Sequence, residues 1–546
     1  MVRRGIARQN PTALTGDEAF FTELRGLSAG TDAMSQLEHP DGRVELAPNV
    51  VLDDPALFNL DLAPTPLAKR TWTTYTFAAL WISMAHCIPT YMLASGLIKA
   101  GMNWWQALLT ILLGNTIVLV PILANSHPGT KYGIPFPVFA RAAYGVFGAN
   151  VPALMRALVA CGWFGIQCWI GGHALFRLGE ALSPSWPTAL GRATLQGFLP
   201  TEWLCFLAFW GLHILIIYRG MDVLRRVENW AAPYVLVMTL ALVVWAVRRA
   251  SEVGHGLGDV LSAPGRFTTF GSFFAVFVPS VTAMVGFWAT LSLNMPDFAR
   301  YGRSQKEQML GQVVALPTTM TLFAAMGVLV TSASAQIFGE AIWNPVDLGA
   351  KFESRWLVGL AEFTVVIATL AMNIAANVVS PANDLANVSP GKISFRTGGL
   401  VTGIVATLMM PWRLLADSDR YINGWLLGYS GGLGSIAGVL IYDYWFVKKT
   451  KLDLADLYRR DGVYAYAGSG WNGSAILATA AGCGIAWCGL FVPALHILYD
   501  AAWFSGGFGA ALVYALLMRG RHGPTRGAAP EEPGAYGERS LSPPLE

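Results

Sequence analysis

Twelve apolar stretches follow one another between residues 73 and 518, and this repetition constrains the fold more than any other feature of the sequence. Each stretch is roughly 17 to 28 residues long, which lets a helix cross the hydrocarbon core of a bilayer, about 30 Å thick. Only 13% of the residues are charged, about half of the share in soluble domains. The sequence therefore predicts an all-helical, multi-pass membrane protein and excludes a soluble enzyme. The stretches lie near residues 73–100, 104–124, 150–178, 203–218, 228–247, 270–293, 313–338, 356–381, 397–413, 421–447, 474–497 and 501–518.

The two ends of the chain differ in composition from this middle part. Residues 1–66 and 519–546 are poor in apolar side chains, so we expect two solvated, disordered tails beside a twelve-span domain at residues 67–518. No apolar run precedes about residue 70, and we therefore expect no cleavable signal peptide. Lysine and arginine are more frequent in the even-numbered loops, which predicts that both tails lie on the cytoplasmic side of the plasma (cell inner) membrane.

Charge, cysteine spacing and motifs exclude several other classes of protein. A formal net charge of +3 indicates no surface for nucleic acid. The six cysteines form no C-x-x-C pair and no metal-binding spacing, so we expect neither a disulfide framework nor a metal site. The predicted spans contain no H-E-x-x-H or G-x-S-x-G motif and no pair of carboxylates, so we expect no enzyme and no cofactor.

The first and sixth predicted spans are both interrupted. Span 1 contains His86 and Pro89 in mid-membrane, and span 6 contains Gly286 in mid-span and Pro296 near one end. Proline removes an amide donor and glycine weakens the helix, so each site frees backbone groups that lipid cannot satisfy. Interrupted spans at the first and sixth positions indicate two inverted five-helix repeats, each of which opens with a broken helix that lines a cavity. Two ordinary proline kinks are the alternative.

Spans 3 and 8 carry amide side chains at helical spacing. Trp163 and Gln167 are four residues apart, and Asn373 and Asn377 repeat that spacing, so each pair shares one helix face. In an inverted-repeat fold these amides would meet at one cavity, where they suit the N–H and C=O edges of a neutral cyclic amide. Trp163 and Trp288 would then hold a flat ring between two aromatic faces. The alternative is that the amides only join helices.

Several motifs, in the right order, resemble those of the nucleobase-cation-symport-1 family of uracil, cytosine, purine, allantoin and hydantoin permeases. The resemblance runs from about Arg70 to Met518. It implies twelve spans, the five-plus-five inverted-repeat (LeuT-like) fold, and a secondary active transporter that binds its substrate at broken helices 1 and 6. The motifs are RTWTTYTFAALWISMAHCIPTY, HPGTKYGIPFPVFARAAYGVFGANVPALMRALVACGWFGIQCWIGG, GFWATLSLNMPDFARYGRSQKEQ, NIAANVVSPANDLANVSP and GSIAGVLIYDYWFVKK.

The same resemblance assigns substrate-binding positions. The matching residues are Trp163 and Trp288 for the stacking pair, Gln167 and Asn377 for the hydrogen-bonding amides, Asn373 beside them, and Gly286 for a backbone contact. His86 and Cys87, at the break in span 1, complete the predicted contacts. Allantoin-type members carry Asn where this chain has Cys87, which favours import of uracil or a purine. An allantoin or hydantoin permease is the alternative, and an amino-acid or amine carrier of the same fold is a more distant one.

Ion coupling is the point at which the sequence departs from the family pattern. A sodium-coupled member places two hydroxyls immediately before the first Asn of helix 8, where this chain has Ala371 and Met372. A thioether is a poor ligand for a hard cation, so we expect H⁺ rather than Na⁺ as the coupling ion. The residues whose oxygens could still serve a cation are Ser83, His86, Ala368 and Thr369.

Proton coupling requires a titratable group within reach of the cavity. His86 is the first candidate, because imidazole titrates near physiological pH, although a neutral histidine that bonds the loosened helix is the alternative. Glu362, expected to face the outer aqueous vestibule, is the second. Asp297 and Asp384 lie near predicted helix ends, where we expect helix termination or gating, and we expect His213 to pack locally. The predicted partners are a small heterocycle and the lipid bilayer, with the protein acting as a monomer.

Overall fold

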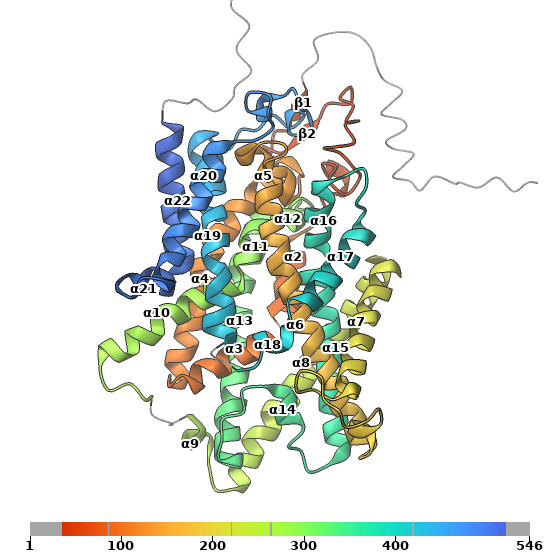
Figure 1. The fold of residues 1–546 in the computed structure, drawn as a ribbon, viewed down its shortest axis with the longest axis vertical. Helices are drawn as coiled ribbons and strands as arrows, with labels where there is room; N and C mark the ends of the chain where they lie inside the picture. Colours follow the sequence, from red (N-terminus) through yellow and green to blue (C-terminus); the bar gives the residue numbers. More distant parts are fainter. Residues whose placement is uncertain (1–34, 86, 220, 262–264, 418–419, 520–546) are drawn as a thin grey trace, which may run out of the picture.

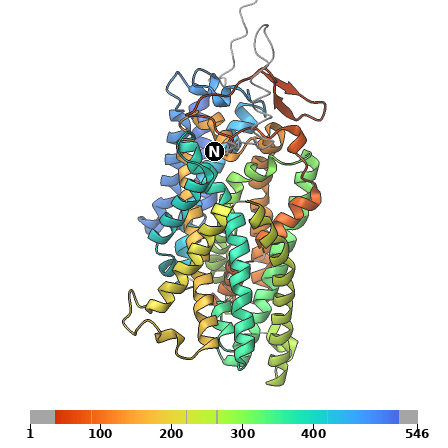
Figure 2. The same ribbon diagram turned by 90° about the vertical axis from the view of Figure 1, so that its right-hand side faces the viewer.

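The structure is a computed structural model that describes residues 35–85, 87–219, 221–261, 265–417 and 420–519. Long helices run roughly along one axis and form an elongated bundle (Figures 1 and 2). We call the end that carries β1 (Gln36–Glu38), β2 (Val44–Leu46) and α5 (Phe136–Tyr144) the upper end. The opposite end, with α9 (Leu257–Leu261) and α14 (Pro345–Gly349), is the lower end.

Within the described residues, nine helices are long and apolar enough to cross a membrane, and two bent pairs raise the candidate spans to as many as eleven. The prediction of twelve is not reached because α17 (Phe395–Leu408), which covers the ninth predicted stretch, has only 14 residues, about 21 Å of helix. The nine are α4 (Trp104–Tyr132), α6 (Asn150–Leu182), α7 (Pro200–Arg219), α8 (Met221–Glu252), α10 (Phe270–Phe287), α13 (Gln305–Phe338), α15 (Arg355–Asn377), the run of η3 (Arg420–Leu426), α19 (Leu427–Tyr442) and η4 (Asp443–Val447), and the run of α20 (Gly473–Trp487) and η7 (Cys488–Leu490).

Shorter helices divide or connect these spans. Span 1 consists of α2 (Thr74–Ala85) and α3 (Ile88–Lys99), whose axes differ by 59°. The last pair, Pro493–Asp500 and α22 (Ala502–Met518), is bent by 89°. The remaining short helices are η1 (Leu67–Lys69), η2 (Trp186–Thr188), α11 (Ala289–Asn294), α12 (Pro296–Ala299), α16 (Val379–Val388), α18 (Pro411–Leu414), η5 (Asp456–Tyr458), η6 (Val463–Ala465), η8 (Pro493–Leu495) and α21 (His496–Asp500).

Residues 35–66 fold against the upper end of the bundle, so the predicted disordered N-terminal tail is wrong for this segment. Strands β1 and β2 pair antiparallel, and Leu62 is fully buried. The Tyr458 hydroxyl donates to the Leu62 carbonyl at 2.7 Å. Arg460 binds the Asp54 carboxylate through two nitrogens at 2.7 Å, and these hydrogen bonds lower the pKa of Asp54. Contacts with the loop around Tyr458 and Arg460 hold this segment in place. No periodicity in the sequence of the segment itself predicts these contacts.

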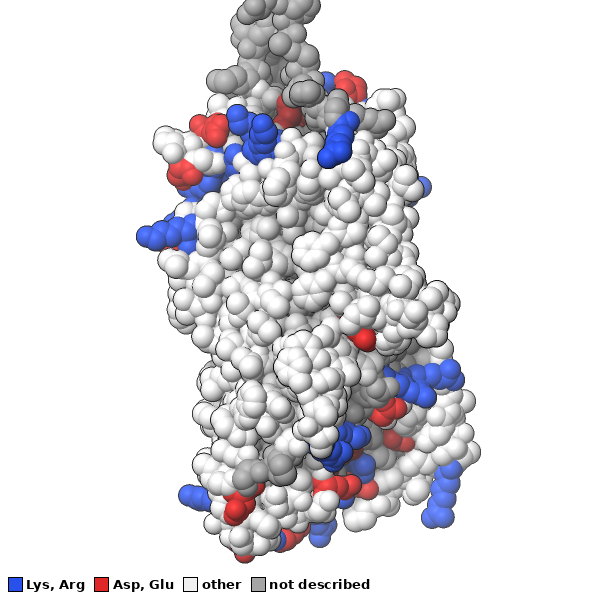
Figure 3. Space-filling model, turned by 90° about the vertical axis from the view of Figure 1, so that its left-hand side faces the viewer, with Lys and Arg blue, Asp and Glu red and all other residues white. Residues whose placement is uncertain are grey.

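Charged side chains gather at the two ends of the molecule. On the face drawn in Figure 3, Lys, Arg, Asp and Glu lie near the top and the bottom, and the middle is nearly free of them. Elsewhere on the surface, large apolar side chains of α4 such as Leu109, Leu113 and Val120 are exposed. An uncharged band between two charged ends is the surface of a protein that spans a bilayer.

Glycines bring the last helices of the bundle into close contact. A Cβ atom at Gly431 of α19 would lie 2.6 Å from the Cβ of Ala486 in α20. A Cβ atom at Gly482 of α20 would lie 2.6 Å from the carbonyl oxygen of Gly506 in α22. Any side chain at either position would force the helices apart, so α19, α20 and α22 pack almost backbone to backbone.

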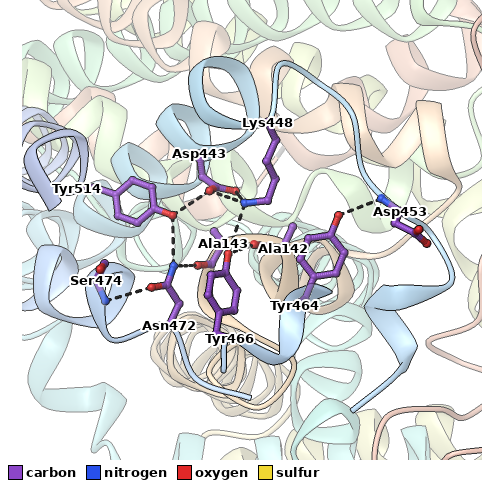
Figure 4. A network of polar contacts seen from close by, with 10 residues as sticks. All are labelled: Ala142, Ala143, Asp443, Lys448, Asp453, Tyr464, Tyr466, Asn472, Ser474 and Tyr514. Atoms are coloured by element: carbon purple, nitrogen blue, oxygen red, sulfur yellow. Dashed lines mark hydrogen bonds and ion pairs between the residues drawn. The ribbon is translucent and has the colours of Figure 1, made fainter. Parts of the chain in front are cut away.

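A network of buried polar side chains fastens the loop after α19 to the upper end of the bundle (Figure 4). Lys448 Nζ lies 2.6 Å from both carboxylate oxygens of Asp443, and the Tyr514 hydroxyl donates to the same carboxylate at 2.8 Å. Asn472 donates an amide hydrogen to the Ala143 carbonyl at 2.7 Å. Because these residues belong to η4, α22, the loop and α5, the network ties four parts of the chain together.

Candidate functional site

The sixth predicted span is divided at Trp288. Helix α10 ends at Phe287 and α11 begins at Ala289, so Trp288 stands between two helices. Just before the division, the Gly286 carbonyl accepts a hydrogen bond from the Tyr429 hydroxyl of α19 at 2.7 Å. The interruption predicted from the sequence thus coincides with a backbone group that bonds a side chain of another helix.

Trp288 is anchored deep between helices. Its indole is 1% exposed, and Nε1 donates to the Asn115 side-chain oxygen of α4 at 2.8 Å. The ring packs edge-on against Trp81 of α2, with centroids 5.1 Å apart, and against Phe287 at 4.9 Å. These contacts fix the plane of the Trp288 ring, because its nitrogen is hydrogen-bonded and two other aromatic rings pack against it.

Trp163 of α6 also packs against Phe287. Its ring contacts Phe287 at a centroid distance of 5.2 Å and Trp425 at 6.1 Å. Nε1 donates to the Tyr429 hydroxyl at 3.3 Å. Phe287 therefore contacts both of the tryptophans that the sequence pairs. Stacking of a substrate ring between Trp163 and Trp288 stays a prediction.

The amides of α6 and α15 lie in contact with each other's helices. Asn377 donates to the Asn373 side-chain oxygen at 3.0 Å, and the Asn373 amide nitrogen lies 3.2 Å from His213 Nε2 of α7. Gln167 Nε2 contacts the Met372 sulfur at 3.0 Å. Gln167 Oε1 is buried without a hydrogen-bond partner among the described residues. A buried acceptor without a partner is costly, and a ligand with an N–H group would satisfy it.

The candidate cation-coupling residues are only partly assembled. Ala368 lines an apolar cavity of about 200 Å³ between α3, α8, α13 and α15, together with Cys87, a predicted substrate-binding residue. The Thr369 hydroxyl is buried and has no partner among the described residues, and Ser83 is half-buried. His86 lies outside the described residues. The Met372 thioether is turned to Gln167, as described above.

Glu362 differs from its expected surroundings. The side chain is fully buried rather than facing an aqueous vestibule, because α14 covers it: a Cβ atom at Gly349 would lie 2.5 Å from Glu362 Oε1. Neither carboxylate oxygen has a hydrogen-bond partner within the described part of the chain. Asp347, also on α14, lines a cavity of about 940 Å³ at the lower end. One short helix thus separates Glu362 from this cavity.

Asp297 and Asp384 form part of a buried polar cluster. Asp384 of α16 is paired with Arg156 of α6 at 2.8 Å, and both side chains are fully buried. Asp297 of α12 accepts the Ser380 hydroxyl at 2.6 Å and the Phe136 backbone N–H, at the start of α5, at 2.9 Å. Asp297 therefore caps another helix, and Asp384 balances a buried guanidinium.

Sequence reasoning did not select Asn115, Phe287, Tyr429 or Arg156, and it assigned His213 a local role. Arg156 and Asn115 carry a signal that sequence alone offers, because each is a strongly polar residue within a predicted apolar span. Phe287 and Tyr429 carry none, since aromatic residues are common throughout the spans.

Comparison with protein families and curated proteins gives consistent matches over most of the chain. The family described as permease for cytosine/purines, uracil, thiamine, allantoin matches residues 64–506. The allantoin permease of Bacillus subtilis is 42% identical over 464 residues, covering 85% of this chain and 93% of that protein. The purine-uracil permease NCS1 of Arabidopsis thaliana is 41% identical over 482 residues, covering 85% and 78%.

Solved structures of one transporter resemble the fold. The nucleobase-cation-symport-1 family transporter Mhp1, in a closed conformation with bromovinylhydantoin bound, superposes with a TM-score of 0.69 at 26% identity, covering 85% of this chain and 95% of that one. Its inward-facing conformation gives a TM-score of 0.68 at 26% identity, covering 86% and 95%. The helical, LeuT-like architecture predicted from the sequence is confirmed by this likeness.

Proposed function

The chain belongs to the family of permeases for cytosine/purines, uracil, thiamine and allantoin, and on this premise we propose that it imports a neutral nucleobase-like heterocycle, uracil or a purine, by cation-coupled symport. It is a multi-pass membrane transporter and not an enzyme. The substrate ring lies between Trp163 and Trp288, and Gln167, Asn373 and Asn377 read its amide edge. The helices then change their packing around the bound ring, so that the site opens to one side of the membrane at a time.

The buried oxygen of Gln167 is the observation that carries this proposal. It has no partner among the described residues, and it lies one helical turn from Trp163 on the same face of α6. An aromatic face beside an unsatisfied amide suits a flat molecule that carries N–H groups. Two aromatic faces and a few amide contacts are enough for micromolar recognition.

Allantoin is the second candidate substrate. The relative from Bacillus subtilis is named an allantoin permease, and the relative from Arabidopsis thaliana a purine-uracil permease, at nearly the same identity. Both kinds of molecule are neutral, cyclic and rich in N–H and C=O groups. Position 87 holds a cysteine where allantoin-type members of the family carry an asparagine, and this difference favours uracil or a purine as the substrate.

Thermal stabilisation of the purified protein tests the substrate class. The panel is uracil, cytosine, thymine, adenine, guanine, uric acid, allantoin and benzylhydantoin, each with and without sodium. A ligand that binds only the folded state stabilises it by about 2.7 kcal/mol at about 100 times its Kd. We expect uracil or a purine to raise the melting temperature regardless of sodium. Stabilisation by allantoin alone would transfer the proposal to the second candidate, and no stabilisation by any compound would contradict it.

We further propose that H⁺ is the coupling ion, bound at His86 or Glu362. The Ala371–Met372 pair offers no side-chain oxygen to sodium, and Glu362 is a buried carboxyl without a hydrogen-bond partner among the described residues. Arg177 and Asp347 both line the cavity at the lower end, from which α14 separates Glu362.

Uptake in proteoliposomes checks the coupling. With an inward proton gradient, uptake of labelled substrate is expected to fall as the external pH rises, because fewer binding groups are protonated. If His86 carries the proton, His86→Gln is expected to remove this pH dependence. If Glu362 carries it instead, Glu362→Gln is expected to remove it. Both variants keep the size of the side chain while losing the titration. Uptake that follows a sodium gradient and ignores pH would contradict proton coupling.

The orientation proposed for the membrane follows from the positive charges at the upper end. The loop after α19 carries Lys448, Lys451, Arg459 and Arg460, and basic loops stay on the cytoplasmic side. We therefore place the upper end and both tails in the cytoplasm. We also propose that the protein lies in the plasma membrane and functions as a monomer.

A further inference from the structure

His213 of α7 contacts Asn373, one of the candidate substrate-binding amides. The proposed transport function assigns it no role. Its side chain is fully buried. The rings of Phe164 and Phe209 pack edge-on against the imidazole, with centroids 5.3 and 4.7 Å away. Nδ1 lies 2.9 Å from the Phe209 carbonyl oxygen, and Nε2 lies 3.2 Å from the Asn373 amide nitrogen. The imidazole is therefore held at both nitrogens and on two sides.

The surroundings of Asn373 fix which way its amide is turned. Its nitrogen lies 3.3 Å from the Phe164 carbonyl oxygen, a group that can only accept a hydrogen bond. A flipped amide would place two oxygens against each other. The NH₂ group therefore donates one hydrogen to Phe164 and directs the other to His213 Nε2, with the Cys168 sulfur as a longer contact at 3.6 Å.

The tautomer of His213 follows from these neighbours. Nε2 must accept from Asn373, and Nδ1 must donate to the Phe209 carbonyl, because each partner allows only that role. The imidazole is therefore neutral and protonated on Nδ1. A phenylalanine of similar shape could fill the space, but it could not accept the Asn373 hydrogen.

The orientation is passed on to Asn377. With its nitrogen committed, Asn373 offers only its oxygen, which accepts a hydrogen from Asn377 Nδ2 at 3.0 Å. The Asn377 oxygen is thereby turned away from Asn373. Gln167 Oε1 is buried without a hydrogen-bond partner in the described part of the chain. The Asn377 oxygen, turned away from Asn373, and the unpaired Gln167 oxygen are the acceptors that these two amides offer.

We propose that His213 is a positioning residue for substrate selection: by fixing the amides of Asn373 and Asn377, it makes the site present oxygen acceptors to a heterocycle edge that carries ring N–H donors. This inference rests on the proposed function. It narrows the substrate to heterocycles with ring N–H groups, and a ring whose nitrogens are alkylated at that edge is rejected. The discrimination comes from these amide oxygens, of which the buried Gln167 Oε1 would otherwise stay unpaired.

The test compares N-methylated ligands in wild-type protein and two matched variants. The probes are uracil, 1-methyluracil and 3-methyluracil, together with hydantoin and its 1-methyl and 3-methyl derivatives, with Kd measured by isothermal titration calorimetry. In the wild type we expect at least one methylation to raise Kd more than about tenfold. His213→Phe is expected to reduce this factor to less than threefold, because the amides are no longer oriented. His213→Gln, which restores an acceptor, is expected to keep it.

The outcomes separate a failure of the inference about His213 from a failure of the proposed function. If His213→Phe weakens the parent and the methylated ligands by the same factor, or if methylation has no effect in a wild type that binds the parent, the inference is overturned and the proposed function stands. If no probe binds the wild type, the proposed substrate class fails and the inference fails with it. Should His213→Phe not fold, His213→Leu serves as the variant without an acceptor.

Discussion

Replacing Asp384 with alanine is expected to lower the free energy of unfolding by about 3–5 kcal/mol. Asp384 and Arg156 are fully buried and 2.8 Å apart, and the Nε and Nη2 atoms of Arg156 have no hydrogen-bond partner among the described residues. Removal of the carboxylate leaves the guanidinium buried with its charge no longer balanced by its direct partner. The melting temperature of the purified protein measures the effect.

Two control variants separate the loss of the ion pair from a loss of packing. The double replacement Arg156→Met with Asp384→Leu removes both charges, and we expect it to recover most of the lost stability, because an apolar pair does not have to be desolvated. Glu353→Ala removes the partner of Arg249 at the surface, where both side chains are exposed, and is expected to leave the melting temperature nearly unchanged. A single variant Asp384→Ala as stable as the wild type would show that Arg156 finds another partner.

The same cluster links the divided span 6 to α16, the short helix that follows α15. Ser380 of α16 donates its hydroxyl hydrogen to Asp297 of α12 at 2.6 Å, and Asn294 of α11 also bonds Ser380. These bonds join the end of span 6 to α16 at the upper end of the bundle. Any movement that separates α12 from α16 must break these hydrogen bonds. The gating role expected for Asp297 and Asp384 stays a prediction, and these are the bonds that gating would break.

The sequence predicts those features that depend on residues close together in the chain. Length and polarity indicate the membrane-spanning stretches, and a spacing of four places Trp163 with Gln167 and Asn373 with Asn377 on shared faces. A helix-weakening glycine at position 286 announces the interruption that the structure has at Trp288.

The remaining features depend on how helices pack, which local patterns do not encode. The hydrogen bond from Trp288 to Asn115 joins residues 173 positions apart, and the bond from Asn373 to His213 joins residues 160 positions apart. Burial of Glu362 depends on α14, a helix of five residues with no periodicity to reveal it. A buried partner of this kind can be identified only from the three-dimensional arrangement of the helices.

Trp288→Ala is expected to have the largest effect on ligand binding. Truncation of a buried tryptophan costs about 3–5 kcal/mol of stability, and Trp288 is 1% exposed with its N–H bonded to Asn115. If the ring also forms one face of the substrate site, affinity should fall more than tenfold, or about 1.4 kcal/mol, in the fraction of protein that remains folded. Kd measured by calorimetry on monodisperse protein checks this.

Two further variants decide whether Trp288 acts on the ligand or only on the fold. Trp288→Phe keeps an aromatic face but leaves the Asn115 oxygen unpaired, which costs about 1–3 kcal/mol of stability. Affinity should therefore be largely retained while the melting temperature falls. Asn115→Leu removes the same hydrogen bond from the other side and should behave alike. A folded Trp288→Ala protein whose affinity stays within tenfold of the wild type would rule out stacking between Trp163 and Trp288, and Phe287, which contacts both rings, would become the aromatic face to examine.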